Sequence, residues 1–478
     1  MSTETKQKIS YPDWVTKHKQ KGTSIFCINN KYYLYKVKSV WNKDKGRAQK
    51  ITEKYLGRIT EQGFVEPKKA ININSPVSVK EYGAVKAVTT LGEDILAKLR
   101  ETFPHEADRL FTLASLRVID PSPFKRAEHT YKHSYLSEMF PNLNLSGKDI
   151  SNFLKEFGQA RQKMVEFMRS FFSDGQHILF DGTSVISKSE KMNINKIGYN
   201  AHKEYDPQIN LLYAFNCDTQ TPAYYRIVAG NVKDVSAFKL SLIETKITNM
   251  IIVADKGFGS EANFKLLEEN NLKYIVPLRR SSLAFDTAKL EKGNKKEFDG
   301  YFVFNERPIW YYKTPEVIVY IDNDLKVAEE KDYILRIEKN LEGYTNEGFI
   351  DRQYKFGAIV LKTNLDKTPK EIYNFYKERR EIEQAFDFLK NLLEQDKTYM
   401  QNEIALEAWS FINHIALMLN YKIYNLLRTN DLLAKYSISD FIQHLKYIYK
   451  IKTDTQWLTS EVSSKTSTML SALKMHIT

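Results

Sequence analysis

The strongest constraint on the fold is the order of apolar segments between residues 177 and 278. In order they are three strands, a helix, a strand, a helix and a strand: HILFDGTSVIS (177–187), INLLYAFNCD (209–218), AYYRIVAGN (223–231), SAFKLSLIETKI (236–247), NMIIVADKGF (249–258), EANFKLLEENN (261–271) and LKYIVPL (272–278). β-Branched and aromatic content indicates the strands, and helical spacing of apolar residues indicates the helices. This order predicts an α/β fold with a mixed sheet.

The remaining segments predict further regions around this sheet. In chain order we expect a basic, β-containing N-terminal DNA-binding region (1–84), a helical region (85–172), the first part of the α/β core (173–280), a β-rich, mostly antiparallel insertion (281–355), the second part of the core (356–427) and a helical tail (428–478). From Pro369 onward we expect continuous helix to about residue 427, because Pro suits a helix start.

The positive charge of the chain is concentrated at its beginning. The formal net charge is +12, and residues 1–70 hold 16 Lys or Arg against 6 Asp or Glu. Such a local surplus favours a polyanionic partner, of which nucleic acid is the usual one, although solubility alone is an alternative. Two cysteines exclude a Cys-rich zinc site and a disulfide framework.

No membrane association is expected. The most apolar late stretch, WSFINHIALMLNYKIYNLL, is interrupted by Asn413, His414, Asn420 and Lys422 and is typical of a buried helix. The first ten residues have no apolar segment of the kind that a secretory signal needs. We therefore expect a cytoplasmic protein.

Two aspartates follow apolar strands. Asp181 ends ILFD and Asp255 ends IIVAD, and the ends of neighbouring strands line the ligand crevice of a mostly parallel sheet. Two ionised carboxylates that lie close together repel unless a cation sits between them, and oxygen donors without Cys favour Mg²⁺ or Mn²⁺. The alternative for each residue is an ordinary turn or helix cap.

The stretch YKERREIEQAFDFLK (376–390) has helical character and charges at the edge of its apolar face. At 100° per residue, four side chains share a stripe about 60° wide: Tyr376, Arg379, Glu383 and Lys390. Glu suits a metal ion, and Arg and Lys suit phosphate. Asp387 and Arg380 lie close by, so geometry does not single out Glu383. Ordinary i, i+4 charge pairs are an equal alternative.

The spacing Tyr376-x2-Arg379-x3-Glu383-x6-Lys390 resembles the signature of the insertion-sequence-four group of bacterial DDE transposases. The strand VLKTN before this helix, the β-rich insertion and the two Asp strands resemble that family as well. The resemblance implies an RNase H-like core. It implies that Asp181, Asp255 and Glu383 are catalytic and hold two Mg²⁺ (or Mn²⁺) ions, and that Tyr376, Arg379 and Lys390 contact DNA. Trp310 of the insertion is a candidate for stacking on a flipped base, with core packing as the alternative.

The activity implied by the resemblance is cut-and-paste transposition of DNA. The enzyme would cleave the ends of its insertion sequence and join the 3′-hydroxyls to target DNA. Its partners would be the terminal inverted repeats and target DNA, bound by a homodimer associated with the nucleoid. A domesticated transposase acting as a non-catalytic DNA-binding regulator is the alternative.

Two other chemistries have weaker support. A haloacid-dehalogenase phosphatase needs a nucleophilic Asp two residues before Asp181, and Leu179 stands there. His129 and His133 have helical i, i+4 spacing, but no third metal ligand is evident near them, so we interpret them as a surface pair.

Overall fold

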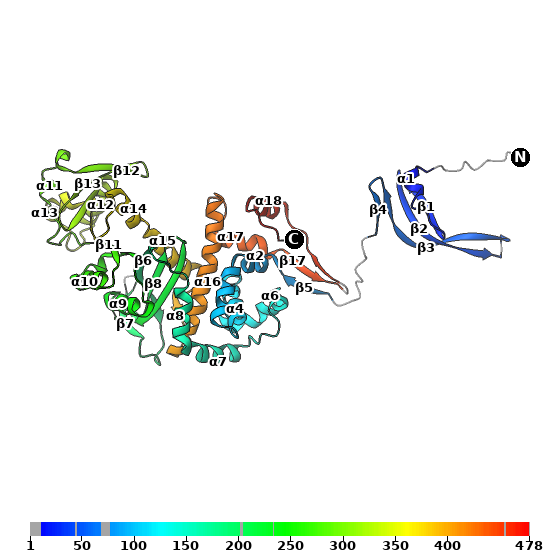
Figure 1. Ribbon diagram of the computed structural model, residues 1–478, viewed down its shortest axis with the longest axis horizontal. Helices are drawn as coiled ribbons and strands as arrows, with labels where there is room; N and C mark the ends of the chain where they lie inside the picture. The colour runs from blue at the N-terminus through cyan, green and yellow to red at the C-terminus, as the bar shows by residue number, and fades with distance from the viewer. Residues whose placement is uncertain are drawn as a thin grey trace. The chain divides into compact units, whose positions relative to one another are not determined.

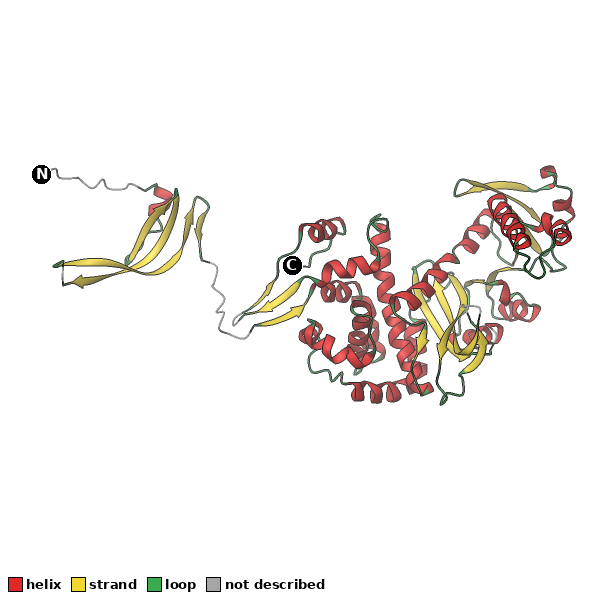
Figure 2. Ribbon diagram, turned by 180° about the vertical axis from the view of Figure 1, so that it is seen from behind, coloured by secondary structure: helices red, strands yellow, loops and turns green. Residues whose placement is uncertain are grey.

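The structure is a computed structural model that describes residues 11–43, 45–67, 77–200, 204–232, 234–453 and 456–477. It consists of two compact units, Met1–Val77 and Ser78–Thr478, whose elements are labelled in Figure 1 and coloured by type in Figure 2. Among the described residues, no helix combines the length and the apolar character that crossing a membrane requires.

The N-terminal unit is an antiparallel sheet with one short helix. Its elements are α1 (Asp13–Thr16), β1 (Thr23–Ile28), β2 (Lys31–Asn42), β3 (Arg47–Thr60) and β4 (Gly63–Val65), with the strands in the order β1-β2-β3-β4. Its described core is a small cluster: Val15, Ile25, Leu34 and Ile59. Gly57 is required where β3 meets β4, because a Cβ there would lie 2.4 Å from the Val65 carbonyl oxygen.

The helical region forms one layer with a long helix from much later in the chain. Its helices are α2 (Gly83–Leu91), α3 (Glu93–Thr102), α4 (Ala107–Ile119), α5 (Ala127–His133), α6 (Leu136–Met139), α7 (Gly147–Phe157) and α8 (Arg161–Arg169). Helices α2, α4 and α7 pack on α16 (Glu403–Thr429). Asn413, which interrupts the apolar stretch of α16, is buried and accepts a hydrogen bond from Arg117 Nε at 3.0 Å.

The core sheet has the expected mixed α/β arrangement. Its elements are β6 (His177–Ser187), β7 (Lys196–Tyr199), β8 (Tyr205–Asn216), β9 (Thr221–Ala229), α9 (Asp234–Thr245), β10 (Ile251–Ala254), α10 (Glu261–Glu269) and β11 (Lys273–Pro277). Strands β6, β8 and β9 form an antiparallel meander, while β10 runs parallel to β6 and β11 parallel to β10. This arrangement confirms the α/β fold with a mixed sheet that the sequence predicted.

The insertion continues the same sheet and is less purely β than expected. Its elements are α11 (Ala288–Glu291), β12 (Gly300–Phe304), β13 (Arg307–Lys313), β14 (Val317–Asp322), α12 (Asn323–Glu338) and α13 (Asn346–Arg352). Strand β15 (Ala358–Thr363) joins β14 to β11 in antiparallel pairing. Helix α12 was not expected from the sequence. Tyr333 is its one buried residue, so the helix lacks the regular spacing of apolar residues that would have indicated it.

The continuous helix expected from Pro369 to about residue 427 is wrong. The segment consists of α14 (Pro369–Lys377), α15 (Arg380–Asp387), a π-helical turn (Phe388–Leu392), β16 (Lys397–Thr398) and α16. Thr368 caps α14 with Glu371 in a capping box, so the start at Pro369 is well defined. Because of these interruptions, a helical wheel with a constant 100° per residue does not describe the side-chain directions of residues 376–390.

The C-terminal segment is not the all-helical tail that we expected. It contains α17 (Ile438–Lys446), β17 (Tyr449–Lys452), β18 (Trp457–Thr459) and α18 (Ser464–Ala472). Strand β17 pairs with both β18 and β5 (Ser78–Glu81). The alternation in KYIYKIK is a strand signal, but its partner β5 lies about 370 residues earlier, and local patterns do not reveal such pairing.

Candidate active site

Strand register places Asp181 and Asp255 side by side. In the parallel pair of β6 and β10, Phe180 lies opposite Ala254, so the next residues along both strands are the two aspartates. Neighbouring strands lie about 4.8 Å apart, and residues at equal register share a face of the sheet. The backbone therefore brings both carboxylates to one face at one level.

The turn alternative for Asp181 is wrong. Asp181 lies in the middle of β6, which continues to Ser187, and the Gly182 N–H donates to Asp181 Oδ1 at 2.8 Å. Asp255 directly follows β10 and precedes a short 3₁₀ turn, but its side chain makes no capping hydrogen bond. Neither aspartate is thus explained by turn or cap chemistry alone.

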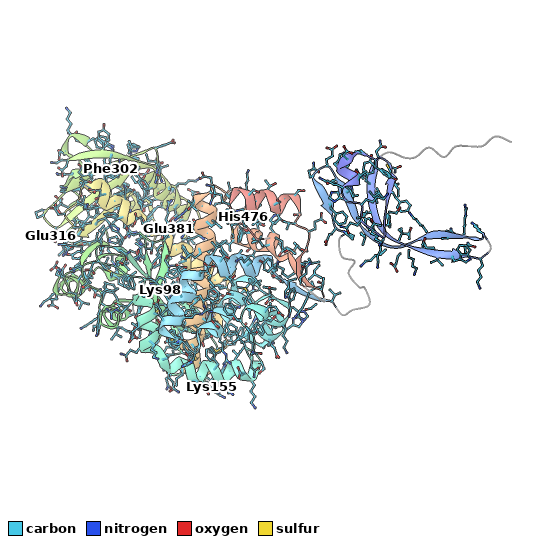
Figure 3. The ribbon with its side chains drawn as sticks, turned by 45° about the vertical axis from the view of Figure 1, so that its right-hand side comes forward. Lys98, Lys155, Phe302, Glu316, Glu381 and His476 are labelled. Carbon is cyan, nitrogen blue, oxygen red and sulfur yellow. The ribbon has the colours of Figure 1, made fainter. Side chains whose placement is uncertain are left out.

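Helix α15 covers the sheet face that carries these aspartates. Asp181 is paired across the strands with Tyr213 of β8, whose ring contacts Phe386 of α15 edge-on at 6.1 Å. Glu383 lies one turn before Phe386 and is exposed. The helix is held by α16, because the Tyr421 hydroxyl donates to the Glu381 carbonyl at 2.7 Å; Figure 3 labels Glu381 beside α16.

Arg379 forms an ion pair with Asp255, and the charges of the other two acidic residues also influence it. It lies at the junction of α14 and α15, and its Nη1 is 3.1 Å from Asp255 Oδ1. Burial works to lower the pKa of Arg379, yet that pKa is raised above its ordinary value. The groups that raise it are, in order of size, Asp255, Tyr376, Asp181 and Glu383. All three expected carboxylates therefore act on one guanidinium.

Tyr376 shares this environment. Its ring lies 5.7 Å from the Arg379 guanidinium carbon, and burial raises the pKa of its hydroxyl. Arg379 lowers that pKa, and the charges of Asp255 and Glu383 raise it further. Tyr376, Arg379 and Glu383 are thus brought together as the spacing predicted, although from two helices.

Lys390 lies in a different environment from the other three signature residues. It belongs to the π-helical turn, whose wider winding changes the direction in which side chains leave the helix axis. Burial lowers the pKa of Lys390, and Asp396 is the charge that opposes this shift. Its contact with DNA stays a prediction.

A comparison of the sequence with known protein families agrees with this arrangement of acidic and basic groups. The family described as "Transposase DDE domain" matches residues 172–419, just over half of the chain. The chain belongs to this transposase family. Members of the family use divalent metal ions.

Comparisons with individual proteins are less close. Among curated proteins, none matches the chain. A solved structure that is similar to this transposase is the piggyBac transposase synaptic complex with hairpin DNA, at 11% sequence identity and a TM-score of 0.39. The similarity covers 78% of this chain and 82% of that one.

The donor set of the transposase fits hard divalent cations. Asp181, Asp255 and Glu383 offer carboxylate oxygens, which Mg²⁺ and Mn²⁺ prefer. Within the described residues, however, no three His, Cys, Asp or Glu side chains are gathered closely enough to hold a metal ion. Close carboxylates repel, and the Arg379 guanidinium supplies the positive charge next to Asp255.

A basic cavity adjoins Asp255. Its volume is about 840 Å³, and its polar lining includes Asp255, Lys256, Arg279, Arg280, Glu329, Tyr376, Lys377 and Arg379. Five cationic side chains against two carboxylates suit a DNA backbone. We did not predict Lys256, Arg279, Arg280 or Lys377. The available signals were the position of Lys256 directly after Asp255 and the pair of arginines after β11.

Trp310 is not brought to the carboxylates. Its strand β13 is separated from β10 by β14, β15 and β11, and the pairing registers place its side chain on the sheet face opposite Asp255. Its ring lies 5.0 Å from that of Tyr301, and Lys295 Nζ lies 4.6 Å from its centre. Stacking of Trp310 on a flipped base stays a prediction.

The histidine pair lies on the surface of the helical region. His129 and His133 are exposed on α5, with ring centres 4.5 Å apart. No third metal-ligating side chain accompanies them in the part of the chain that the structure describes.

Proposed function

We propose that this transposase belongs to the insertion-sequence-four group and performs cut-and-paste DNA transposition. In this reaction it cleaves the ends of its element by hydrolysis of phosphodiesters and joins the 3′-hydroxyl ends to target DNA. The observation that carries the proposal is the placement of Asp181 beside Asp255, with both of them and Glu383 acting on Arg379.

Asp181, Asp255 and Glu383 would hold two Mg²⁺ or Mn²⁺ ions. When bound, such ions activate a water or a DNA 3′-hydroxyl and stabilise the leaving 3′ oxygen. The chain itself would contribute positioning, which is supported by the strand register of Asp181 and Asp255 and by the hydrogen bond that holds α15, the helix of Glu383, on α16. In-line phosphoryl transfer depends mainly on such positioning and on charge neutralisation.

Basic residues around Asp255 would hold the DNA. Arg379 is partly buried with its side chain 18% exposed, so its guanidinium is already directed toward the carboxylates before DNA arrives. A planar guanidinium matches a phosphate with two hydrogen bonds. Lys256, Arg279 and Lys377 extend this positive surface along the cavity. Tyr376 would contact the backbone next to the scissile bond, and Lys390 a phosphate further along.

The partners would be the terminal inverted repeats and target DNA, with two chains acting on paired ends. In the same proposal a homodimer performs both cleavage and joining. It would act in the bacterial cytoplasm, bound to the nucleoid. The basic N-terminal region would supply the sequence recognition that the carboxylates lack.

The test is a cleavage assay with the full chain. The substrate is a duplex that carries the inverted repeat bordering the reading frame, with Mg²⁺ present. Glu383→Gln removes one carboxylate without changing side-chain length, and Asp387→Asn is the matched control, because Asp387 is exposed one turn further along the same helix. We expect Glu383→Gln to abolish nicking and Asp387→Asn to retain it.

Two results would overturn the proposal. Wild-type cleavage by Glu383→Gln would exclude the carboxylate from the reaction. Binding of the duplex without any Mg²⁺- or Mn²⁺-dependent cleavage by the wild type would instead identify a non-catalytic DNA-binding regulator.

A further inference from the structure

The hairpin of β2 and β3 extends well beyond the sheet to which it belongs. β1 pairs with β2 only as far as Lys36, and β4 pairs with β3 only from Arg58 onward. The pairs from Val37↔Thr52 to Asn42↔Arg47 therefore form a two-stranded ribbon without a third strand among the described residues. Six pairs correspond to about 20 Å of ribbon, which Figure 1 shows as a narrow extension.

Packing does not explain the length of this ribbon. None of its residues belongs to the described core of the unit, which lies at the other end of the strands. Trp41 is 63% exposed, and side chains project from both faces in Figure 3. An isolated two-stranded hairpin is marginally stable in water, so a long exposed one is expected where a partner covers it.

The charge of the ribbon is positive. Residues 37–52 contain five basic residues and one acidic one. Glu53 is paired with Lys36 at 3.1 Å and with Lys38 at 3.8 Å. Arg47 and Lys50 form no ion pair with any residue that the structure describes, so their charges are free to meet an anionic partner.

The two faces of the ribbon differ in chemistry. The pairing register places one set on the first face: Lys38, Val40, Asn42, Arg47, Gln49 and Ile51. Asn42 Nδ2 donates to Gln49 Oε1 at 3.1 Å, which orients both amides. Asn and Gln amides match the edge of adenine, and Arg matches guanine, in the major groove.

We infer that residues 37–52, the β2–β3 arm, enter the major groove of duplex DNA and read bases with Asn42, Arg47 and Gln49. The major groove is wide enough for a two-stranded β-ribbon. Lys43 and Lys45, at the tip of the arm, neutralise phosphates on the groove wall. The inference rests on the proposed function in one respect, since the DNA it concerns is the terminal repeat of that reaction.

The experiment measures binding of the full chain to two duplexes in Ca²⁺ at several salt concentrations. One duplex carries the inverted repeat that borders the reading frame, and the other is a scrambled sequence of equal length and composition. The variant Arg47→Ala/Gln49→Ala removes base-reading groups, and Ser39→Ala/Thr52→Ala changes the opposite face as the matched control. All four side chains are exposed, so folding is expected to be kept.

We expect Arg47→Ala/Gln49→Ala to lower affinity for the repeat by about tenfold or more while affinity for the scrambled duplex changes little. Lys43→Ala/Lys45→Ala is expected to weaken both duplexes alike and to reduce the salt slope by about two. Protection of guanine N7 from methylation at the repeat should be lost in the first variant only.

The inference is overturned if Arg47→Ala/Gln49→Ala and Lys43→Ala/Lys45→Ala both bind the duplexes as the wild type does. It is also overturned if protection is found at adenine N3 in the minor groove instead. Its failure differs from failure of the proposed function. If the arm binds the repeat but no Mg²⁺-dependent cleavage occurs, the proposed transposase chemistry is refuted and the DNA-reading role of the arm is retained. If cleavage occurs and no arm variant affects it, the role of the arm is refuted and the proposed chemistry is retained.

Discussion

Two regions of the large sheet use backbone pairing for different purposes. In its interior, the parallel register of β6 and β10 places two carboxylates side by side beneath α15, next to a cavity lined by cations. At the β12–β14 end, antiparallel pairing gathers aromatic rings that pack on one another, including Trp310 with Tyr301 and Phe298. In the proposed function the charged interior region carries the chemistry, whereas the aromatic β12–β14 end packs the insertion together.

The largest effect should come from Asp181→Asn. The change keeps the side-chain shape but removes one of the two adjacent negative charges that would hold the divalent ions. We expect cleavage to fall at least about 10³-fold, equivalent to about 4 kcal/mol in the activation barrier. Gel-shift titration should give an unchanged affinity for DNA, and equal cleavage rates would remove Asp181 from the site.

Arg379→Lys should have an intermediate effect. Lysine keeps the charge next to Asp255 but loses the planar fork that binds phosphate through two hydrogen bonds. We expect cleavage to fall by about 10- to 100-fold, the range seen when a supporting partner of a ligand is changed. Arg380→Lys, at the exposed neighbouring position, is the control and should cleave normally. An unimpaired Arg379→Lys would show that only charge is needed there.

The region around β6 also contains a buried histidine that should make the core sensitive to acid. His414 of α16 lies between the rings of Tyr213 and Tyr225, and burial lowers its pKa to about 3. Between this pKa and the ordinary value near 6.5, the unfolded chain binds more protons, so stability is complete above about pH 6.5 and falls as the pH drops. At pH 5 the loss should be about 2 kcal/mol.

Denaturant unfolding of the wild type and His414→Phe at pH 7.5 and pH 5 measures this contribution. The variant should lose less stability on acidification than the wild type, by roughly the same 2 kcal/mol. If both proteins lose equal stability, other groups cause the acid sensitivity and His414 is not the responsible residue.

The sequence was informative where a pattern is local. The apolar runs before Asp181 and Asp255 predicted strands that end near these residues. The family resemblance, carried by the spacing of Tyr376, Arg379 and Glu383, implied a shared site, which helical periodicity alone left open. Local patterns did not reveal the junction at Glu378 and Arg379, because its residues are all strong helix formers. They also missed Lys256 and Arg279, since the cavity that contains them is formed by strands and helices distant in the chain.

The smallest effect on cleavage should come from Trp310→Ala at the aromatic end of the sheet. Three strands separate its side chain from β10, and it lies on the opposite face of the sheet from Asp255, so its removal should leave the carboxylates in place. Loss of the contacts with Tyr301 and Lys295 should lower the stability of the insertion, whereas cleavage per folded molecule should stay within about twofold, or roughly 0.4 kcal/mol. Trp310→Phe separates the two explanations, because Phe retains a ring that can stack on a base. If cleavage collapses in the Ala variant and is restored by Phe while the fold is intact, then Trp310 acts on DNA, and the insertion moves toward the carboxylates when DNA binds.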